Sequence, residues 1–272
     1  MRIRRAEENG VVYLTYENLE QTGIVTHGVS TRVGGVSEGF LGSMNLSYSR
    51  GDRKENVDEN FRKIGAAIGF SVENLVLTDQ THTNHVRVVT SEDRGKGFDK
   101  ERDYADVDAL VTNVPGLVLA AFFADCVPLF FVDPVKRAIG IAHSGWRGTV
   151  EKIGSKVVQK MSAQYGSKPA DLIAAIGPSI CPDCYEVSED VASEFLHNFP
   201  KEAENIVKKG KREGKYQLDL WHANRCVMTE AGILPENISM PGICTCCNKE
   251  FLHSHRGNHG NRGNLGAFLM LN

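Results

Sequence analysis

The stretch DALVTNVPGLVLAAFFADCVPLFFVDPVKRAIGIA, residues 108–142, has the strongest β-strand pattern in the chain. It contains four apolar runs, each separated from the next by turn residues, at 108–111, 117–123, 128–132 and 138–142. Continuous apolar runs of this length are typical of strands that are buried on both faces. The centre of the chain therefore predicts a buried sheet.

Helical and further strand patterns lie on both sides of this centre. Apolar residues recur at helical spacing over 56–68, and 149–165 has the pattern of an amphipathic helix. Further helices are predicted near 189–198 and over 218–231, and shorter strands at 11–14, 23–26, 74–77, 85–89, 172–176 and 265–271. The lysine-rich segment 201–215 is expected to be an exposed loop. We expect an α/β fold, with residues 1–272 forming a single domain of mixed sheets flanked by helices.

The composition excludes several classes of protein. The chain has 272 residues, of which 41% are hydrophobic, and 31 basic and 34 acidic residues give a net charge of −3. These charges are spread along the chain, so we expect no nucleic-acid partner and no membrane-surface partner. The N-terminus lacks the apolar segment of a secretory signal, and the longest apolar run is too short to span a bilayer. We expect a cytoplasmic protein that acts on small molecules.

Three residues that can bind metal occur where predicted strands end. Cys126 lies between the second and third central runs, His143 follows the fourth, and His82 follows the strand predicted at 74–77. Zinc binds Cys thiolate and His nitrogen, and a catalytic site uses three protein ligands with one position left open. The ligands are too far apart in sequence to form a compact motif, and each alone is readily explained by burial. Together, their place at strand ends permits a zinc site.

Several motifs resemble the YfiH/YlmD family, whose members are also called laccase-domain proteins, purine nucleoside phosphorylases or peptidoglycan editing factors. They are TDQTH at 78–82, ADVDALVT at 105–112, ADCVP at 124–128, AHSGWRGT at 142–149, IGPSI at 176–180 and CYEV at 184–187. With HGVSTR at 27–32, the resemblance covers nearly the whole chain. It implies a layered α/β/β/α fold and a zinc site formed by His82, Cys126 and His143.

The resemblance also implies an activity and substrates. These are phosphorolysis of adenosine, inosine, guanosine and methylthioadenosine, and deamination of adenosine to inosine. A zinc site with an open position suits both reactions, because it can generate a nucleophile from water or hold an oxyanion such as phosphate. Arg32 and Arg147 are candidates to bind phosphate, since guanidinium donors match phosphate oxygens, and Asn45 is a candidate to bind substrate. We expect a monomer or a small homo-oligomer.

Two positions depart from the family pattern. Cys181 stands where a small residue is expected, and the final Gly-Arg pair is replaced by Gly263-Asn264, with Arg262 displaced.

The seven cysteines need an explanation other than disulfides, because their number is odd and a cytosolic chain of this size does not require them. A structural four-cysteine zinc site is one hypothesis for the group Cys181, Cys184, Cys244, Cys246 and Cys247. Separate buried thiols are favoured, since a long segment separates the two halves of the group.

Other functions stay open on the residues alone. A cysteine hydrolase would use Cys126 as nucleophile and His143 as base, with Asp125 or His82 orienting the base. Such an enzyme would be an amidase that edits cell-wall precursors. A non-enzymatic nucleotide-binding module is the least favoured, because no phosphate-loop motif is present.

Copper chemistry is the remaining alternative, as a copper-dependent polyphenol oxidase. Cys and His ligands accept copper as well as zinc, and His253, His255 and His259 invite this interpretation. One His-x-His pair cannot build a trinuclear copper cluster, so we expect these histidines on a mobile surface or in a substrate loop.

Overall fold

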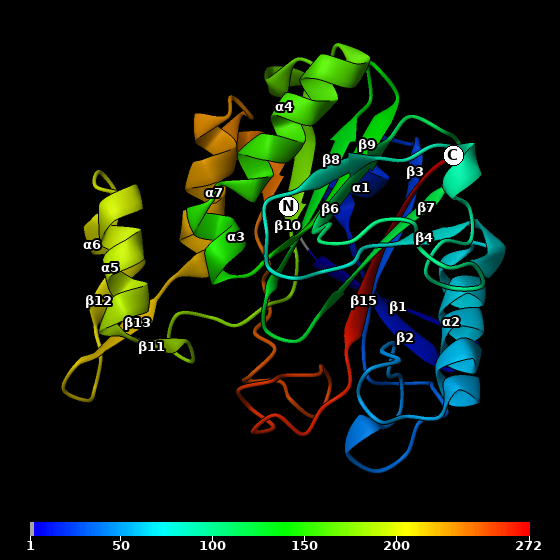
Figure 1. Ribbon diagram of the computed structural model, residues 1–272, viewed down its shortest axis with the longest axis horizontal. Helices are drawn as coiled ribbons and strands as arrows, with labels where there is room; N and C mark the ends of the chain where they lie inside the picture. Colours follow the sequence, from blue (N-terminus) through cyan, green and yellow to red (C-terminus); the bar gives the residue numbers. More distant parts are fainter. Residues whose placement is uncertain (1–2) are drawn as a thin grey trace.

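Two six-stranded sheets pack face to face in the computed structural model, which describes residues 3–272 (Figure 1). The first sheet has the strand order β1 (Ile3–Glu8), β2 (Val11–Tyr16), β3 (Val25–Ser30), β15 (Leu265–Leu271), β7 (Val118–Phe123) and β4 (Leu75–Leu77). The second has the order β14 (Ile238–Ser239), β10 (Ile173–Ile176), β8 (Val127–Asp133), β9 (Ala138–Ser144), β6 (Ala109–Thr112) and β5 (Val86–Val88). A third, small sheet contains β11 (Glu186–Ser188), β13 (Lys215–Leu218) and β12 (Val207–Lys209).

Helices cover the outer face of each large sheet. The first sheet packs against α2 (Lys54–Ile68), and the second against α4 (Ile153–Tyr165) and α7 (Leu220–Glu230) (Figure 1). The remaining helices are α1 (Glu17–Glu20), α3 (Trp146–Val150), α5 (Glu189–Asn198) and α6 (Ala203–Ile206), with 3₁₀ turns at Gly39–Leu41, Val72–Asn74, Ser91–Asp93, Pro169–Asp171 and Pro235–Asn237. Over residues 3–272, every helix is too short or too polar to cross a membrane. The layers follow the expected α/β/β/α order.

Strand β8 shows why the central runs are continuously apolar. Its Leu129 and Phe131 pack into the cluster beneath the helices, whereas Phe130 and Val132 pack between the two sheets. Successive side chains of a strand point to opposite faces, and here both faces are buried. The prediction of buried central strands is therefore confirmed.

The predicted helix over 149–165 is wrong in its first part. Two helices replace it, because Lys152 adopts a left-handed conformation with φ 61° between α3 and α4. In the short α3, Thr149 is buried and its hydroxyl bonds to the carbonyl of Gly145 at 2.9 Å. The break lets the first turn lie close to the end of β9, while α4 follows the sheet.

The prediction of a loop over 201–215 is also wrong. The segment forms α6 and strand β12, which pairs antiparallel with β13. Ile206 is buried, while the side chains of Lys208 and Lys209 are exposed. The lysines are solvated as expected, but one apolar residue and the pairing with β13 impose regular structure.

His27 on β3 makes the stability of the fold sensitive to acid. Its ring is buried, and Nε2 accepts a hydrogen bond from the backbone N–H of Tyr16 at 2.8 Å. Burial lowers the pKa of His27 to about 4, from an ordinary value of 6.5. The unfolded chain therefore takes up this proton first, so stability is intact above pH 6.5 and is lost as the pH falls toward 4. At pH 5 the loss is expected to be about 2 kcal/mol.

The variant His27→Gln tests this expectation, because glutamine retains an acceptor but does not titrate. Urea unfolding at pH 7 and pH 5 should show that the variant loses about 2 kcal/mol less free energy of unfolding than the wild type. The exposed His197 on α5 supplies the control, and His197→Gln should behave as the wild type does. An equal pH dependence in His27→Gln would contradict the expectation.

Candidate active site

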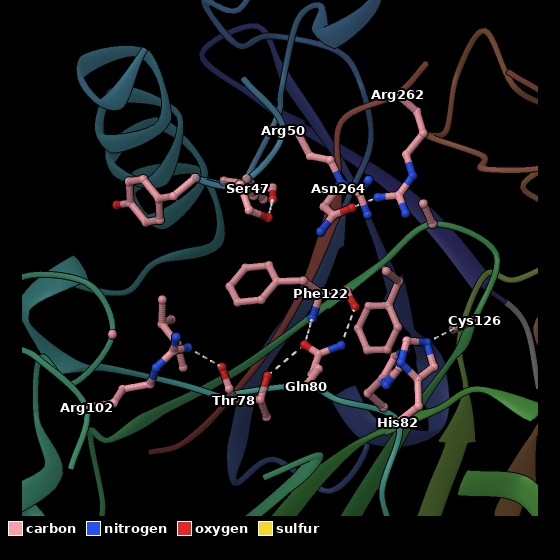
Figure 2. Close-up of a pocket in the computed structure, with 18 residues that line it drawn as sticks. Ser47, Arg50, Thr78, Gln80, His82, Arg102, Phe122, Cys126, Arg262 and Asn264 are labelled. Carbon is pink, nitrogen blue, oxygen red and sulfur yellow. Dashed lines mark hydrogen bonds between the residues drawn. The ribbon is translucent and has the colours of Figure 1, made fainter. Parts of the chain in front are cut away.

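A cavity of about 330 Å³ lies where β4, β7 and β9 end and β15 begins. This volume is within the range of about 300–1,000 Å³ that is usual for small-molecule sites. The polar side chains that line it include Arg50, Gln80, His82, Arg102, Arg262 and Asn264 (Figure 2). Cys126 and His143 also line it, so the three expected metal ligands face one cavity.

The structure brings His82, Cys126 and His143 together. One ligand atom from each lies within 4.8 Å of the others, and Sγ of Cys126 is 4.0 Å from Nε2 of His82. The two imidazole rings are 4.9 Å apart and nearly perpendicular. A thiolate and two imidazoles at this separation fit a zinc ion with one open position.

Local backbone turns direct these side chains into the cavity. Asp125, with φ 85°, turns the chain from β7 in one sheet to β8 in the other and leaves Cys126 at the crossing. His82 also has a positive φ, 67°. A methyl group on Gly145 would lie 2.9 Å from the His82 ring and 3.2 Å from Sγ of Cys126. Glycine at 145 therefore keeps the space that the cluster needs.

Asp108 is the carboxylate that orients two of the three residues. It is fully buried, and its Oδ1 lies 2.7 Å from Nδ1 of His143. Its other oxygen accepts hydrogen bonds from the backbone N–H groups of Thr81 and Thr83, both at 3.0 Å, on either side of His82. This leaves Nε2 of His143 free to bind a ligand, as is usual for a metal-binding histidine. Sequence reasoning did not identify Asp108, although the residue lies within the motif at 105–112.

The charged forms of Cys126 and His143 stabilise each other. Burial raises the pKa of the Cys126 thiol, but His143 and His82 outweigh this effect and bring the pKa to about 6, below the ordinary 9.0. Burial lowers the pKa of His143, but Cys126 and Asp108 outweigh it and raise that pKa to about 9. The site thus favours a thiolate, which is the form of cysteine that binds metal.

Removing the charge of Asp108 should weaken metal binding. We expect Asp108→Asn to lower zinc affinity by about 10- to 100-fold, because the ring of His143 and the loop of His82 lose the anion that orients them. Competition with a chromophoric chelator measures this affinity. Asp106→Asn is the matched control, since Asp106 is exposed and bonds the Thr81 hydroxyl in the same loop. Zinc affinity in Asp108→Asn equal to that of the wild type would exclude the orienting role.

Two arginines give one end of the cavity a positive charge. Figure 2 shows Arg50 and Arg262 on either side of Asn264, to which Arg262 is hydrogen-bonded. Arg262 is only 8% exposed, and its Nε has no hydrogen-bond partner in the described part of the chain. Burial, together with repulsion from Arg50, lowers the pKa of Arg262 to about 10 from 12.5. The ion pairs found within residues 3–272 include neither arginine, so this end is suited to an anion.

Comparisons with known proteins identify the family. Residues 26–272 match the family described as "Multi-copper polyphenol oxidoreductase laccase". The chain belongs to this laccase-domain family. A laccase-domain relative named "Purine nucleoside phosphorylase YlmD", from Bacillus subtilis, is 38% identical over 249 residues, which cover 90% of this chain and 88% of the relative. A protein named "Purine nucleoside phosphorylase" from Deinococcus radiodurans is 37% identical over 91% of this chain and 89% of its own length.

Solved laccase-domain structures have the same fold. The crystal structure of YlmD from Geobacillus stearothermophilus has a TM-score of 0.89 at 32% identity and covers 98% of this chain and 97% of its own. The structure of the Bacillus licheniformis hypothetical protein YfiH has the same TM-score at 34% identity and covers 99% of both chains. The resemblance to the YfiH/YlmD family is confirmed, and so is the mixed α/β fold.

The three predicted substrate-binding residues lie outside the lining of this laccase-domain cavity. Arg32 donates hydrogen bonds to the carbonyls of Gly42 and Lys249, both at 2.8 Å. The Arg147 guanidinium lies 4.2 Å from the Trp146 ring centroid.

Asn45 contacts a residue that lines the cavity, Asn264. It is buried, and its Oδ1 accepts a hydrogen bond from the backbone N–H of Asn264 at 3.1 Å. Sequence reasoning did not identify Arg50 and Arg262, which do line the cavity. The displacement of Arg262 from the family's Gly-Arg pair was a signal for one of them. Arg50 belongs to no motif that distinguishes it from neighbouring surface arginines.

The histidines of the last loop differ in burial, because His255 and His259 are exposed whereas His253 is not. His253 is completely buried, and its Nδ1 accepts a hydrogen bond from the backbone N–H of Gly263 at 3.2 Å, so of the two expected placements the mobile surface is wrong for it. The clusters of metal-binding groups within the described part of the chain include none of His253, His255 and His259. These histidines therefore do not assemble a copper cluster in this laccase-domain fold.

Proposed function

We propose that this laccase-domain protein is a zinc-dependent purine nucleoside phosphorylase that also cleaves methylthioadenosine and deaminates adenosine. The observation that carries the proposal is one cavity that combines a Cys-His-His cluster with two arginines that form no ion pair with a carboxylate among residues 3–272. The names of the Bacillus subtilis and Deinococcus radiodurans relatives support the same activity. Purine nucleosides and phosphate would be the substrates.

His82, Cys126 and His143 would hold the zinc ion. When bound, zinc supplies a Lewis acid and lowers the pKa of a water molecule at its open position. Asp108 keeps Nδ1 of His143 occupied, so that the other ring nitrogen faces the cavity. In this proposal, Asp108 would orient the histidine ligands and the two histidines would favour the thiolate.

Phosphorolysis needs an anion held beside the ribose. An oxygen of phosphate forms a bond to C1′, the bond from C1′ to the purine nitrogen breaks, and the purine leaves with the electron pair and takes up a proton. Arg50 and Arg262 would hold the phosphate, because charge-assisted hydrogen bonds from guanidinium groups match its oxygens. Tyr48 and Phe122 line the same cavity and offer aromatic surface to the purine ring.

Deamination would use water in place of phosphate. The water oxygen forms a bond to purine C6, the bond from C6 to the amino nitrogen breaks, and ammonia leaves after taking up a proton. This reaction requires the Cys-His-His cluster but no bound anion. The two activities should therefore differ in their dependence on phosphate and on the arginines.

The decisive experiment incubates the purified zinc-loaded protein with adenosine, with and without phosphate. Chromatography should detect adenine and ribose 1-phosphate only when phosphate is present, and inosine in both reactions. Methylthioadenosine with phosphate should release adenine. The absence of all these products from fully zinc-loaded protein would refute the proposed function.

A cysteine hydrolase is the second candidate, and one observation favours it. Cys126, His143 and Asp108 lie in the order of a nucleophile, a base and an orienting carboxylate. Of the two orienting groups expected from sequence, Asp125 is occupied elsewhere, because its Oδ1 accepts hydrogen bonds from the hydroxyls of Thr245 and Ser254, each at 2.6 Å.

Alkylation of Cys126 separates the two candidates. If the thiolate is a zinc ligand, iodoacetamide should inactivate only the enzyme that is alkylated in the metal-free state, as assayed after zinc is added back. Equal inactivation of metal-free and metal-loaded enzyme would favour the amidase. Metal analysis of the native protein separates zinc from copper and so tests the polyphenol oxidase alternative.

A further inference from the structure

Four cysteines form a second cluster outside the cavity. The sulfur atoms of Cys181, Cys184, Cys244 and Cys247 all lie within 4.8 Å of one another. Each half of the cluster is a Cys-x-x-Cys segment, one before β11 and the other before the last loop. The expectation of separate buried thiols is therefore wrong. We propose that these four cysteines bind a structural zinc ion.

The spacing of the sulfur atoms matches tetrahedral coordination. With a zinc–sulfur distance of about 2.3 Å, the sulfur atoms of a four-cysteine site are about 3.8 Å apart. The sulfurs of Cys184 and Cys247 are 3.4 Å apart, and all seven cysteines of the chain are free thiols. Four sulfur ligands in this arrangement select zinc or iron rather than magnesium or calcium. We assign zinc rather than iron, because an ion whose role is to hold two segments together has no need of redox activity.

Backbone donors already surround one of the sulfurs. The N–H groups of Cys181 and Cys247 donate to Sγ of Cys244 at 3.3 and 3.4 Å. These donors come from both Cys-x-x-Cys segments and favour the thiolate form that a metal requires. The turns of the two segments thus point backbone donors at the same sulfur atom.

A cation lies beside the cluster and offsets its negative charge. Four thiolates around a divalent ion leave a net charge of −2. Arg256 donates hydrogen bonds to the carbonyl of Cys184 at 3.2 Å and to that of Glu186 at 3.0 Å. Its guanidinium group is therefore fixed against the Cys184 segment, where it stabilises an anionic site.

The proposed ion would link two segments that are hydrogen-bonded to the turn before Cys126. Thr245, inside the second Cys-x-x-Cys segment, donates a hydrogen bond to Asp125, and the backbone N–H of Arg256 donates to the same carboxylate, both at 2.6 Å. Ile180, next to the first segment, donates its N–H to the carbonyl of Asp125 at 3.0 Å. Asp125 precedes Cys126, so the four-cysteine site would stabilise the turn that positions that thiol.

The test uses the variant Cys126→Ala, in which the thiolate of the cavity site is absent. Purified under reducing conditions and loaded with zinc, it should retain one tightly bound zinc ion per chain. After exchange for Co²⁺, it should show the intense charge-transfer absorption of a four-thiolate site. Adding Cys184→Ser should abolish this absorption and release the ion, whereas adding Cys246→Ser, in the same turn as Cys247, should change neither.

A second measurement does not depend on folding of the Cys184→Ser variant. Zinc should protect Cys181, Cys184, Cys244 and Cys247 of the Cys126→Ala chain from iodoacetamide, while Cys246, which belongs to no metal-binding cluster of the described residues, is modified with or without zinc, as mass spectrometry of peptides would show. A disulfide between the two segments, iron in place of zinc, or no zinc-dependent protection would each overturn the proposal. Loss of nucleoside phosphorolysis affects the proposed function alone, because these readouts do not use activity.

Discussion

Replacing Cys126 or His143 by alanine is expected to lower adenosine phosphorolysis by at least about 1,000-fold. Either change leaves two of the three ligands that meet within 4.8 Å, and two ligands do not hold a catalytic zinc ion firmly. A metal that stabilises the reacting oxyanion contributes several kcal/mol, which corresponds to this change in rate. Measurement of kcat/KM by chromatography, with zinc content determined on the same samples, tests the expectation.

The matched control is His85→Ala. His85 is exposed, lies on the same loop as His82, and contacts the carbonyl of Asp106 at 3.0 Å through Nδ1. Its loss should leave zinc content and kcat/KM near those of the wild type, whereas His82→Ala should lower both. Circular dichroism must show that each variant is folded, because His143→Ala also exposes the buried charge of Asp108. A folded Cys126→Ala protein with wild-type activity would remove the thiolate from the reaction.

Replacing Arg262 by methionine is expected to lower phosphorolysis by about 100-fold at low phosphate while leaving deamination of adenosine unchanged. Each charge-assisted hydrogen bond to an anion contributes about 1.5–3 kcal/mol, and Arg262 faces the cavity as a buried donor. Deamination uses water, so it should not depend on this cation. Initial rates at varied phosphate, measured for both reactions in the same assay, give the comparison.

The variant Arg262→Met should also differ from the wild type in its Tm. Without phosphate, Arg262→Met removes a buried cation whose Nε has no hydrogen-bond partner among the described residues, so we expect Tm to rise. Adding phosphate should raise the Tm of the wild type, because an anion that binds only the folded state stabilises it, but not that of the variant. Arg53→Met, an exposed arginine near Arg50, should match the wild type in both respects. An unchanged phosphate KM in Arg262→Met would exclude Arg262 from the phosphate site.

The sequence predicted most of the elements because burial leaves a local pattern. The run at 117–123 is apolar throughout, and the strand β7 that it forms is covered on both sides. Local patterns failed where a contact distant in sequence decides the structure. Pairing with β13 makes a strand of Val207–Lys209, although the lysines there have the pattern of a solvated loop.

Local patterns likewise identified some of the candidate functional residues and missed others. His82, Cys126 and His143 were identifiable because each has a ligand atom and belongs to a family motif. Asp108 was not, because its role depends on a distance of 2.7 Å to a residue 35 positions later in the chain. Arg50 and Arg262 were missed for a related reason, since a cation that lines a cavity has no local pattern that distinguishes it from a surface cation.

The sequence by itself determined the α/β class, the buried central strands and the three residues proposed to bind zinc. Only the tertiary structure decided that the cavity at these residues ends in two arginines, and that Cys181 and Cys184 meet Cys244 and Cys247. The physical reason is that side-chain periodicity reports which face of an element is buried, but not which other element covers it. Coordination and electrostatics depend on distances between atoms, and these arise only when the sheets pair and pack.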